Sequence, residues 1–207
     1  MSRVMPESYR ALYINRKDER AVEYPWVWEN LIPSGRILDV GCCESGFCDE
    51  LAKLGCYEVY GIDIRDAKPK GWTFIKADIR RTDFPCGFFD QIVCISTLEH
   101  IGMKAYGNAW LDEEHGDRMA LLEMNRILKV GGSMLITVPY GSRGDYWVRF
   151  YNRHSLKRLF EGFNWKAEYM KLEDGVWKPC SLKVDVLPPR KGGLPNAVAL
   201  IKVIKDG

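Results

Sequence analysis

Apolar and polar positions alternate along this chain in blocks that predict short strands followed by helices. Ile37, Leu38 and Val40 are the apolar positions of a strand that leads into Gly41. Beyond that glycine, Phe47, Leu51 and Leu54 recur at helical spacing. The stretch therefore predicts a buried strand, a turn and a helix. Such a turn is a candidate ligand cradle, because bare backbone N–H groups are expected at the start of the helix.

The same reading extends over the rest of the chain. Further parallel strands are predicted at residues 57–62, 73–76, 89–95 and 133–138. Helices are predicted at residues 20–31, 117–129 and 152–160, with Asn152 capping the last and Pro25 kinking the first or confining it to the part after the proline. Residues 164–172 and 197–205 predict two terminal antiparallel strands, joined by a long loop over 173–196. Strands alternating with helices predict an α/β fold with both sheet faces covered.

Composition narrows the function classes. The chain has 207 residues, enough for one well-buried domain, and a net charge of +2 from 30 basic and 28 acidic residues. This balance disfavours nucleic acid and membrane partners and favours a small molecule. Seven cysteines without C-x-x-C spacing suit a reducing cytoplasm. We find no signal-peptide core and no apolar run of membrane-spanning length, so we expect a cytoplasmic protein.

Acidic residues close three successive predicted strands. Asp39 ends the first, and Asp63 follows the second at the distance where an acidic side chain binds ribose hydroxyls in dinucleotide-type folds. Asp78 follows the third, where its carboxylate is placed to accept from an adenine amino group while Ile79 offers a backbone N–H and an apolar wall. Each acid alone is equally well a turn or cap residue. All three at the carboxyl edge of one sheet indicate a ligand site.

Five blocks within residues 22–141 resemble the Rossmann-like S-adenosylmethionine-dependent methyltransferases. They are ILDVGCCESGF, YGIDI, KADI, FDQIVCISTLEHIG and LKVGGSMLITVP. The resemblance implies a single-domain α/β fold with a seven-stranded sheet, mostly parallel with an antiparallel C-terminal strand and helices on both faces. It divides residues 1–207 into an N-terminal helical region (1–35), a cofactor-binding core (36–141) and acceptor-side elements (142–207).

The resemblance implies S-adenosylmethionine as cofactor and assigns its contacts by position. The implied cofactor-binding residues are Asp39, Gly41, Cys42, Cys43, Gly46, Asp63, Ile64, Asp78, Ile79 and Ser96. One departure concerns the first turn, where Cys43 and Ser45 stand at positions at which the family usually has further glycines. The same residues disfavour a nicotinamide dehydrogenase, which would show G-x-G-x-x-G.

Methyl transfer benefits from a base near the reacting methyl, and histidine titrates in the useful range. His100, beside Glu99 and just after the fourth strand, is the first catalytic candidate. The alternative is that His100 merely bonds backbone at a strand end. His115 and Asp117 are the second candidate pair, with a solvated loop and a helix cap as their alternative. Three scattered histidines without ligand spacing predict no catalytic metal.

The segments STLEHIG and TVPYG resemble a branch common among sugar- and glycan-modifying methyltransferases. This implies methylation of a hydroxyl or amine on a small polar acceptor, such as a sugar-containing natural product, a nucleotide sugar or a glycan. An aromatic and basic cluster after the fifth strand is a candidate acceptor grip: Tyr140, Arg143, Tyr146, Trp147 and Arg149. Two alternatives stay open, an RNA or protein methyltransferase and a catalytically silent cofactor-binding scaffold.

Overall fold

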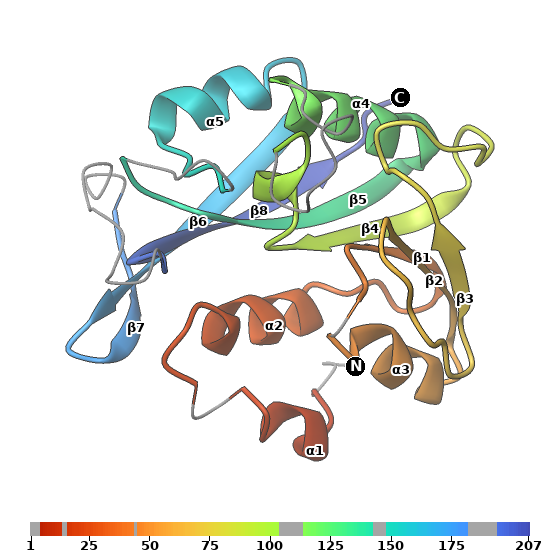
Figure 1. Ribbon diagram of the computed structural model, residues 1–207, viewed down its shortest axis with the longest axis horizontal. Coiled ribbons are helices and arrows are strands. Elements are labelled where there is room, and N and C mark those ends of the chain that lie inside the picture. Colours follow the sequence, from red (N-terminus) through yellow and green to blue (C-terminus); the bar gives the residue numbers. More distant parts are fainter. Residues whose placement is uncertain (1–4, 14–15, 44, 104–113, 143–147, 182–193) are drawn as a thin grey trace.

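The computed structural model of the chain is a single mixed sheet with helices on both faces (Figure 1). It describes residues 5–13, 16–43, 45–103, 114–142, 148–181 and 194–207. Helices α4 (Gly116–Ile127) and α5 (Arg153–Leu159) cover one face of the sheet. The other face carries α1 (Glu7–Arg10), α2 (Arg20–Glu29) and α3 (Phe47–Lys53). The predicted α/β class is confirmed.

The sheet has eight strands in the order β3-β2-β1-β4-β5-β8-β6-β7. Their bounds are β1 Gly35–Val40, β2 Tyr57–Asp63, β3 Thr73–Lys76, β4 Phe89–Ile95, β5 Leu128–Pro139, β6 Asn164–Glu173, β7 Val176–Pro179 and β8 Ala197–Ile204. Strands β1 to β5 pair in parallel, whereas β6, β7 and β8 pair antiparallel. The prediction of seven strands was wrong by one, because β7 lies in the segment predicted as a loop.

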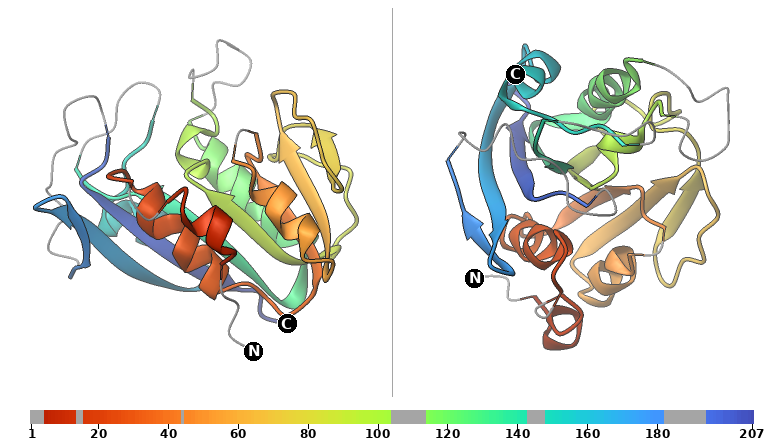
Figure 2. Two further views of the ribbon diagram at one scale, coloured as in Figure 1. Left: turned by 90° about the horizontal axis from the view of Figure 1, so that it is seen from below. Right: turned by 60° about the vertical axis from the view of Figure 1, so that its left-hand side comes forward.

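Strand β7 forms a hairpin with β6 at the edge of the sheet farthest from β3 (Figure 2). Asp174 and Gly175 make the turn with φ of 53° and 76°, and Glu173 pairs with Val176. Two consecutive positive φ angles suit a two-residue hairpin turn, for which Asp-Gly is a favoured sequence. The turn therefore supplies the physical reason for the eighth strand.

Two helix boundaries also differ from the sequence prediction. Helix α2 runs through Pro25 without stopping, because buried side chains on both sides of the proline, Tyr24 and Trp26 among them, hold it against the sheet. Helix α4 ends at Ile127, since Leu128 is already extended and pairs with Phe89 as the first residue of β5. Helix α5 begins as predicted, with Asn152 accepting from the Ser155 N–H in a capping box.

The hydrophobic core has one layer on each face of the sheet. One layer joins the sheet to α4 and α5, and the other joins it to the N-terminal helices and α3. Trp28 and Phe47, each at most 1% exposed, pack edge to face in the second layer with ring centroids 5.8 Å apart. No helix in the described part of the chain is long and apolar enough to cross a membrane.

Strand β1 lies between β2 and β4, and this order determines where a ligand can bind. The chain leaves β1 for β2 and β3 on one side, then crosses back to place β4 on the other. In open parallel sheets such a reversal leaves a crevice at the carboxyl ends of the strands. The residues that follow β1 and β4 are therefore brought together at this crevice.

Candidate active site

A cavity of about 370 Å³ lies at the carboxyl ends of β1 to β4. Its wall includes one or more residues that follow each of these strands: Gly41, Asp63, Asp78, Ser96 and Thr97. A second part of the wall comes from the N-terminal segment: Tyr13, Arg16, Arg20 and Tyr24. The crevice expected from the strand order is thus present, and part of its wall comes from N-terminal residues that lie outside the strand motifs.

The first turn is tightly packed at Gly41. This residue has a φ of +80°, and a Cβ there would lie 2.2 Å from Thr97 Oγ1. Three backbone N–H groups of the turn already have protein acceptors, because Gly41 and Cys42 donate to the Ile62 carbonyl and Cys43 donates to Asp63 Oδ2. These three N–H groups of the turn are therefore not bare, whereas the N–H groups expected to meet the ligand are those at the start of the helix.

Asp63 presents a fixed carboxylate at the end of β2. Its oxygens accept from the Cys43 N–H at 3.1 Å and from the Arg65 N–H at 2.9 Å, and the Arg65 guanidinium lies 3.3 Å away. Burial alone would raise the pKa of Asp63, but the hydrogen bonds from Arg65 and Cys43 outweigh it and hold the pKa below its usual value. Asp63 is therefore an ionised acceptor on the cavity wall.

Asp78 repeats the same local design at the end of β3. Each acid begins an Asp-Ile-Arg tripeptide, and the arginine two residues on returns to its carboxylate. The Arg80 guanidinium contacts both Asp78 oxygens, at 3.1 and 2.6 Å for the closest pairs. Ile64 and Ile79, the middle residues, both line the cavity, and Ile79 is 6% exposed.

Asp39 lies behind the turn. It is 3% exposed, it is not part of the cavity wall, and its Oδ2 accepts from Cys48 Sγ at 3.4 Å. Burial raises its pKa to about 7. Cys42 and Gly46 also lie outside this wall and line a neighbouring surface pocket instead, whereas Cys43 lines both.

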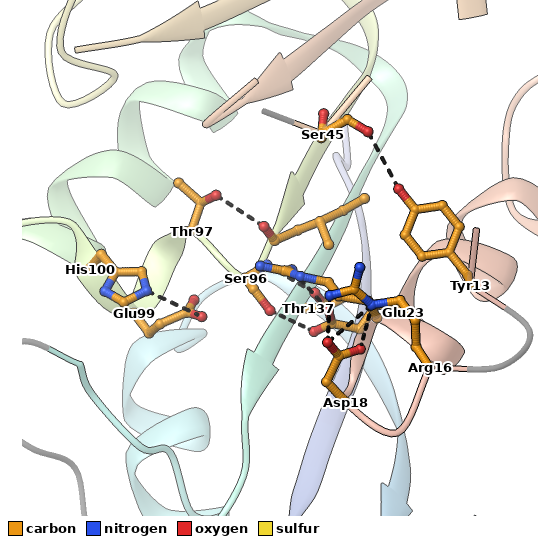
Figure 3. A network of polar contacts seen from close by, with 12 residues as sticks. Tyr13, Arg16, Asp18, Glu23, Ser45, Ser96, Thr97, Glu99, His100 and Thr137 are labelled. Carbon is orange, nitrogen blue, oxygen red and sulfur yellow. Dashed lines mark hydrogen bonds and ion pairs between the residues drawn. The ribbon is translucent and has the colours of Figure 1, made fainter. Parts of the chain in front are cut away.

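His100 reaches the cavity from the short 3₁₀ helix η1 (Leu98–His100). Its Nε2 lies 4.0 Å from Oε1 of Glu99. Figure 3 draws this pair of side chains with a dashed line between them. Glu99 is 2% exposed, and burial raises its pKa well above the usual value. The separation exceeds hydrogen-bond length.

The second candidate pair lies away from the cavity. His115 is exposed at the start of α4. Asp117 is 8% exposed, and its Oδ2 accepts from the Tyr151 hydroxyl at 2.9 Å. Neither residue contributes to the cavity wall. The structure therefore brings His100 into the site and leaves His115 and Asp117 outside it.

The N-terminal segment is anchored to the first turn by two tyrosines. The hydroxyls of Tyr9 and Tyr13 each lie 3.3 Å from the Ser45 carbonyl and donate to it (Figure 3 for Tyr13). This contact brings Arg16 and Arg20 to the cavity, which the sequence analysis missed. A usable signal was the i, i+3 spacing of Arg20 and Glu23 on a helix whose other residues are mainly apolar.

One group of side chains in the described part of the chain has the geometry to hold a metal ion. The ligand atoms of Cys42, Cys43 and Asp63 lie within 4.8 Å of one another. The Asp63 carboxylate already accepts hydrogen bonds from Arg65, whose positive charge opposes a cation at this point.

A family model of a methyltransferase domain matches residues 13–169. The chain belongs to the methyltransferase-domain family. This match covers most of the chain, including the strand ends and the N-terminal wall that form the cavity. The search of curated proteins found no matching relative.

Solved structures share the fold of this methyltransferase. An S-adenosylmethionine-dependent methyltransferase from Methanosarcina mazei matches 89% of this chain and 99% of its own, with 17% identity and a TM-score of 0.61. Phosphoethanolamine N-methyltransferase 2 of Haemonchus contortus, in complex with phosphomonomethylethanolamine and S-adenosylhomocysteine, matches 86% and 50%, with 15% identity and a TM-score of 0.58. The 1,6-didemethyltoxoflavin N1-methyltransferase of Burkholderia thailandensis matches 97% and 78%, with 13% identity and a TM-score of 0.56.

The cavity of the methyltransferase fits the cofactor of its family. Asp63 and Asp78 supply acceptors for hydroxyl and amino groups, and Ile79 supplies an apolar surface. At Gly41 the backbone turns where a side chain would collide with Thr97, so this part of the cavity wall is bare backbone. Carboxylate acceptors, an apolar surface and a close backbone turn at the carboxyl edge of a parallel sheet suit a nucleoside with a polar tail.

The described members of the aromatic and basic cluster are used for packing. Tyr140 is fully buried, with its ring 4.7 Å from that of Tyr169. Arg149 donates to the Ile101 carbonyl. Arg143, Tyr146 and Trp147 lie outside the described residues.

Proposed function

We propose that this methyltransferase transfers a methyl group from S-adenosylmethionine to a hydroxyl or amine of a small polar acceptor, such as a sugar or a sugar-containing natural product. The observation that carries the proposal is the position of His100. Its side chain lines the same cavity as Asp63 and Asp78, so a base and the cofactor acceptors share one space.

In this proposal the strand ends hold the cofactor. The Asp63 carboxylate accepts from the ribose hydroxyls, because it is ionised and already fixed by the Cys43 N–H and Arg65. Asp78 accepts from the adenine amino group, and Ile79 packs against the ring. The cavity then has Ser96, Thr97 and His100 left for the amino-acid end of the cofactor and for the acceptor.

The cofactor, when bound, supplies a methyl group that is already activated as a sulfonium. The chain's own task is to orient the acceptor and to receive its proton. We assign the proton to the imidazole of His100, since neutral imidazole is a base in the physiological range. Glu99 lies 4.0 Å from His100 Nε2, and burial keeps its carboxyl neutral, so it lies beside the imidazole without a countercharge.

A small acceptor is supported by the form of the site and by two fold relatives. The cavity of about 370 Å³ must take both the cofactor and the acceptor. Two structures with the same fold contain or are named for small acceptors, phosphomonomethylethanolamine in one and 1,6-didemethyltoxoflavin in the other. The nearly balanced charge of the chain gives no footprint for RNA.

The acceptor is tested with methyl-labelled S-adenosylmethionine against panels of sugars, nucleotide sugars, small amines, RNA and unfolded protein. We expect labelled product only in the small-molecule panels. Label in RNA or protein alone would establish a macromolecular methyltransferase instead. Cofactor binding without any labelled product, across panels in which control enzymes work, would favour the silent scaffold.

A further inference from the structure

Two thiols and a carboxylate meet where β1 and β2 end. The ligand atoms of Cys42, Cys43 and Asp63 all lie within 4.8 Å of one another. Val40, the last residue of β1, pairs with Ile62, so the turn that follows it lies beside the last residue of β2. The Cys43 N–H donates to Asp63 Oδ2 at 3.1 Å and holds the turn against the carboxylate. The strand register therefore brings these three side chains together.

Packing fixes the Cys42 thiol next to β2. Cys42 is 4% exposed. A Cβ on Gly61 would lie 2.7 Å from Cys42 Sγ and 2.6 Å from the Trp72 ring, so the thiol and the indole fill the space that this glycine leaves. The Trp72 indole is held in turn, because its Nε1 donates to Asp49 Oδ1 at 2.6 Å. Cys42 is thus a preoriented sulfur on the Asp63 side of the turn.

Solvent reaches this group through the neighbouring surface pocket, which has a volume of about 310 Å³. Cys42 and Cys43 line that pocket, and Cys43 and Arg65 line both it and the cofactor cavity. Cys43 is half-buried, and its Sγ donates to the Asp66 carbonyl at 3.5 Å. Asp63 belongs to the wall of the cofactor cavity. The three ligand atoms therefore lie at the boundary between the two spaces.

The donor set is that of a thiophilic ion. Two cysteine sulfurs with one carboxylate are typical ligands of zinc, whereas magnesium and calcium are bound by oxygen atoms. Burial raises the pKa of the Cys42 thiol, so this thiol keeps its proton in the metal-free protein. A metal ion that binds both sulfurs displaces their protons, which pass to the solvent.

The loss of these protons reverses the charge balance at Asp63. Arg65 opposes a cation there as long as both sulfurs are neutral thiols. Two thiolates and the Asp63 carboxylate together carry three negative charges. A divalent ion and the Arg65 guanidinium then balance them. The arginine thus neutralises the filled site that it would otherwise oppose.

We propose that Cys42, Cys43 and Asp63 bind a thiophilic divalent metal ion of the zinc class, and that this ion competes with the cofactor. The three residues leave one position of a tetrahedral site for water from the surface pocket. The competition rests on the proposed function, in which Asp63 accepts from the ribose hydroxyls. A metal ion takes lone pairs and negative charge from that carboxylate, so its hydrogen bonds to ribose weaken.

Cadmium tests the site directly, because its bonds to thiolates absorb in the ultraviolet. We titrate the metal-free, reduced protein with Cd²⁺ and expect one saturating band. Cys43→Ser is expected to weaken Cd²⁺ binding at least about tenfold, since it removes one sulfur from a half-buried position. Cys56→Ser, at an exposed cysteine outside the group, is the control and is expected to leave the titration unchanged. No band in the wild-type protein, or an equal titration in Cys43→Ser, would overturn the metal site.

Competition is measured by calorimetric titration with S-adenosylhomocysteine, with and without saturating Cd²⁺. We expect Cd²⁺ to weaken nucleoside binding at least about tenfold in the wild-type protein and in Cys56→Ser. At the same Cd²⁺ concentration the effect is expected to be below about twofold in Cys43→Ser. Each variant is compared with itself, so a direct effect of Cys43→Ser on the nucleoside cancels.

Equal nucleoside affinity with and without bound Cd²⁺ would overturn the competition. Failure of the metal-free wild-type protein to bind the nucleoside is a different result. It would overturn the proposed cofactor site and the competition with it, while the ultraviolet band still decides whether the metal site exists.

Discussion

Gly41 and Thr97 are in contact where β1 and β4 end, so closely that a Cβ on Gly41 would lie 2.2 Å from Thr97 Oγ1 and 2.5 Å from its Cγ2. The two residues follow the strands between which the chain reverses its direction along the sheet. Their contact joins the two halves of the parallel sheet at the cavity and leaves no space for a side chain in the first turn.

Gly41→Ala therefore tests the packing of the turn. Alanine is strained at a φ of +80°, and here it also collides with Thr97. We expect a loss of at least about 2 kcal/mol in the free energy of unfolding, measured by urea titration. Gly46→Ala is the matched control, since Gly46 has a φ of +64° but nothing within 4 Å of its added Cβ. Equal losses in the two variants would show that the collision is unimportant, and Thr97→Ala in the Gly41→Ala background is expected to restore part of the difference.

His100→Ala tests the assignment of the base. We expect turnover to fall at least about a hundredfold, because the acceptor proton loses its receiving group. The dissociation constant of S-adenosylmethionine is expected to change less than about threefold, since Asp63 and Asp78 are untouched. His115→Ala, at an exposed position outside the cavity, is the control. Unchanged turnover in His100→Ala would remove this histidine from the mechanism.

Asp117 is expected to stabilise the fold and to have no part in turnover. Its carboxylate accepts from the buried Tyr151 hydroxyl at 2.9 Å. Asp117→Ala leaves that hydroxyl without its partner, which costs about 1–3 kcal/mol in the free energy of unfolding. Tyr151→Phe removes the same bond and is expected to cost less, because no buried hydroxyl remains. Loss of turnover in a stable Asp117→Ala protein would instead return Asp117 to the catalytic candidates.

Asp39 makes stability depend on pH. Its folded pKa of about 7 lies above the unfolded value of 3.8, so folding favours the neutral carboxyl. The contribution of the neutral Asp39 carboxyl to the free energy of unfolding is complete below about pH 4. It is lost as the pH rises to about 7, and the total loss is roughly 4 kcal/mol. We expect Asp39→Asn to become steadily more stable relative to wild type across this window. Asp66→Asn, whose side chain is 80% exposed, is the control. A pH-independent difference between Asp39→Asn and wild type would contradict the burial of a neutral Asp39.

The sequence predicted the strand ends well because each strand has a local signature. Apolar runs followed by Gly41, Asp63 and Asp78 place these residues at one edge of a parallel sheet, and the structure has them on one cavity wall. Which residues of the turn face the cavity depends on packing against the rest of the fold, so the local sequence does not predict it. Asp39 and Cys42 lie within two residues of Gly41 in sequence but are not part of the cavity wall.

Features that depend on distant contacts escaped prediction. The contact of Glu23 with Ser96 joins residues 73 positions apart, and it depends on how α2 docks against the sheet. Strand β7 is different, because its Asp174-Gly175 turn is a local signal for a hairpin. The strand has only four residues and they are mostly exposed. The prolines and glycines in the same segment therefore favoured the prediction of a loop.

The most direct measurement for the account as a whole is calorimetric titration of the protein with S-adenosylmethionine, repeated for Asp63→Ala and for the exposed control Asp66→Ala. We predict one binding site in the wild-type protein, at least about tenfold weaker binding in Asp63→Ala because the ribose hydroxyls lose an ionised acceptor, and unchanged binding in Asp66→Ala. No binding heat in the wild-type protein, or wild-type affinity in Asp63→Ala, would contradict the site described at the ends of β1 to β4.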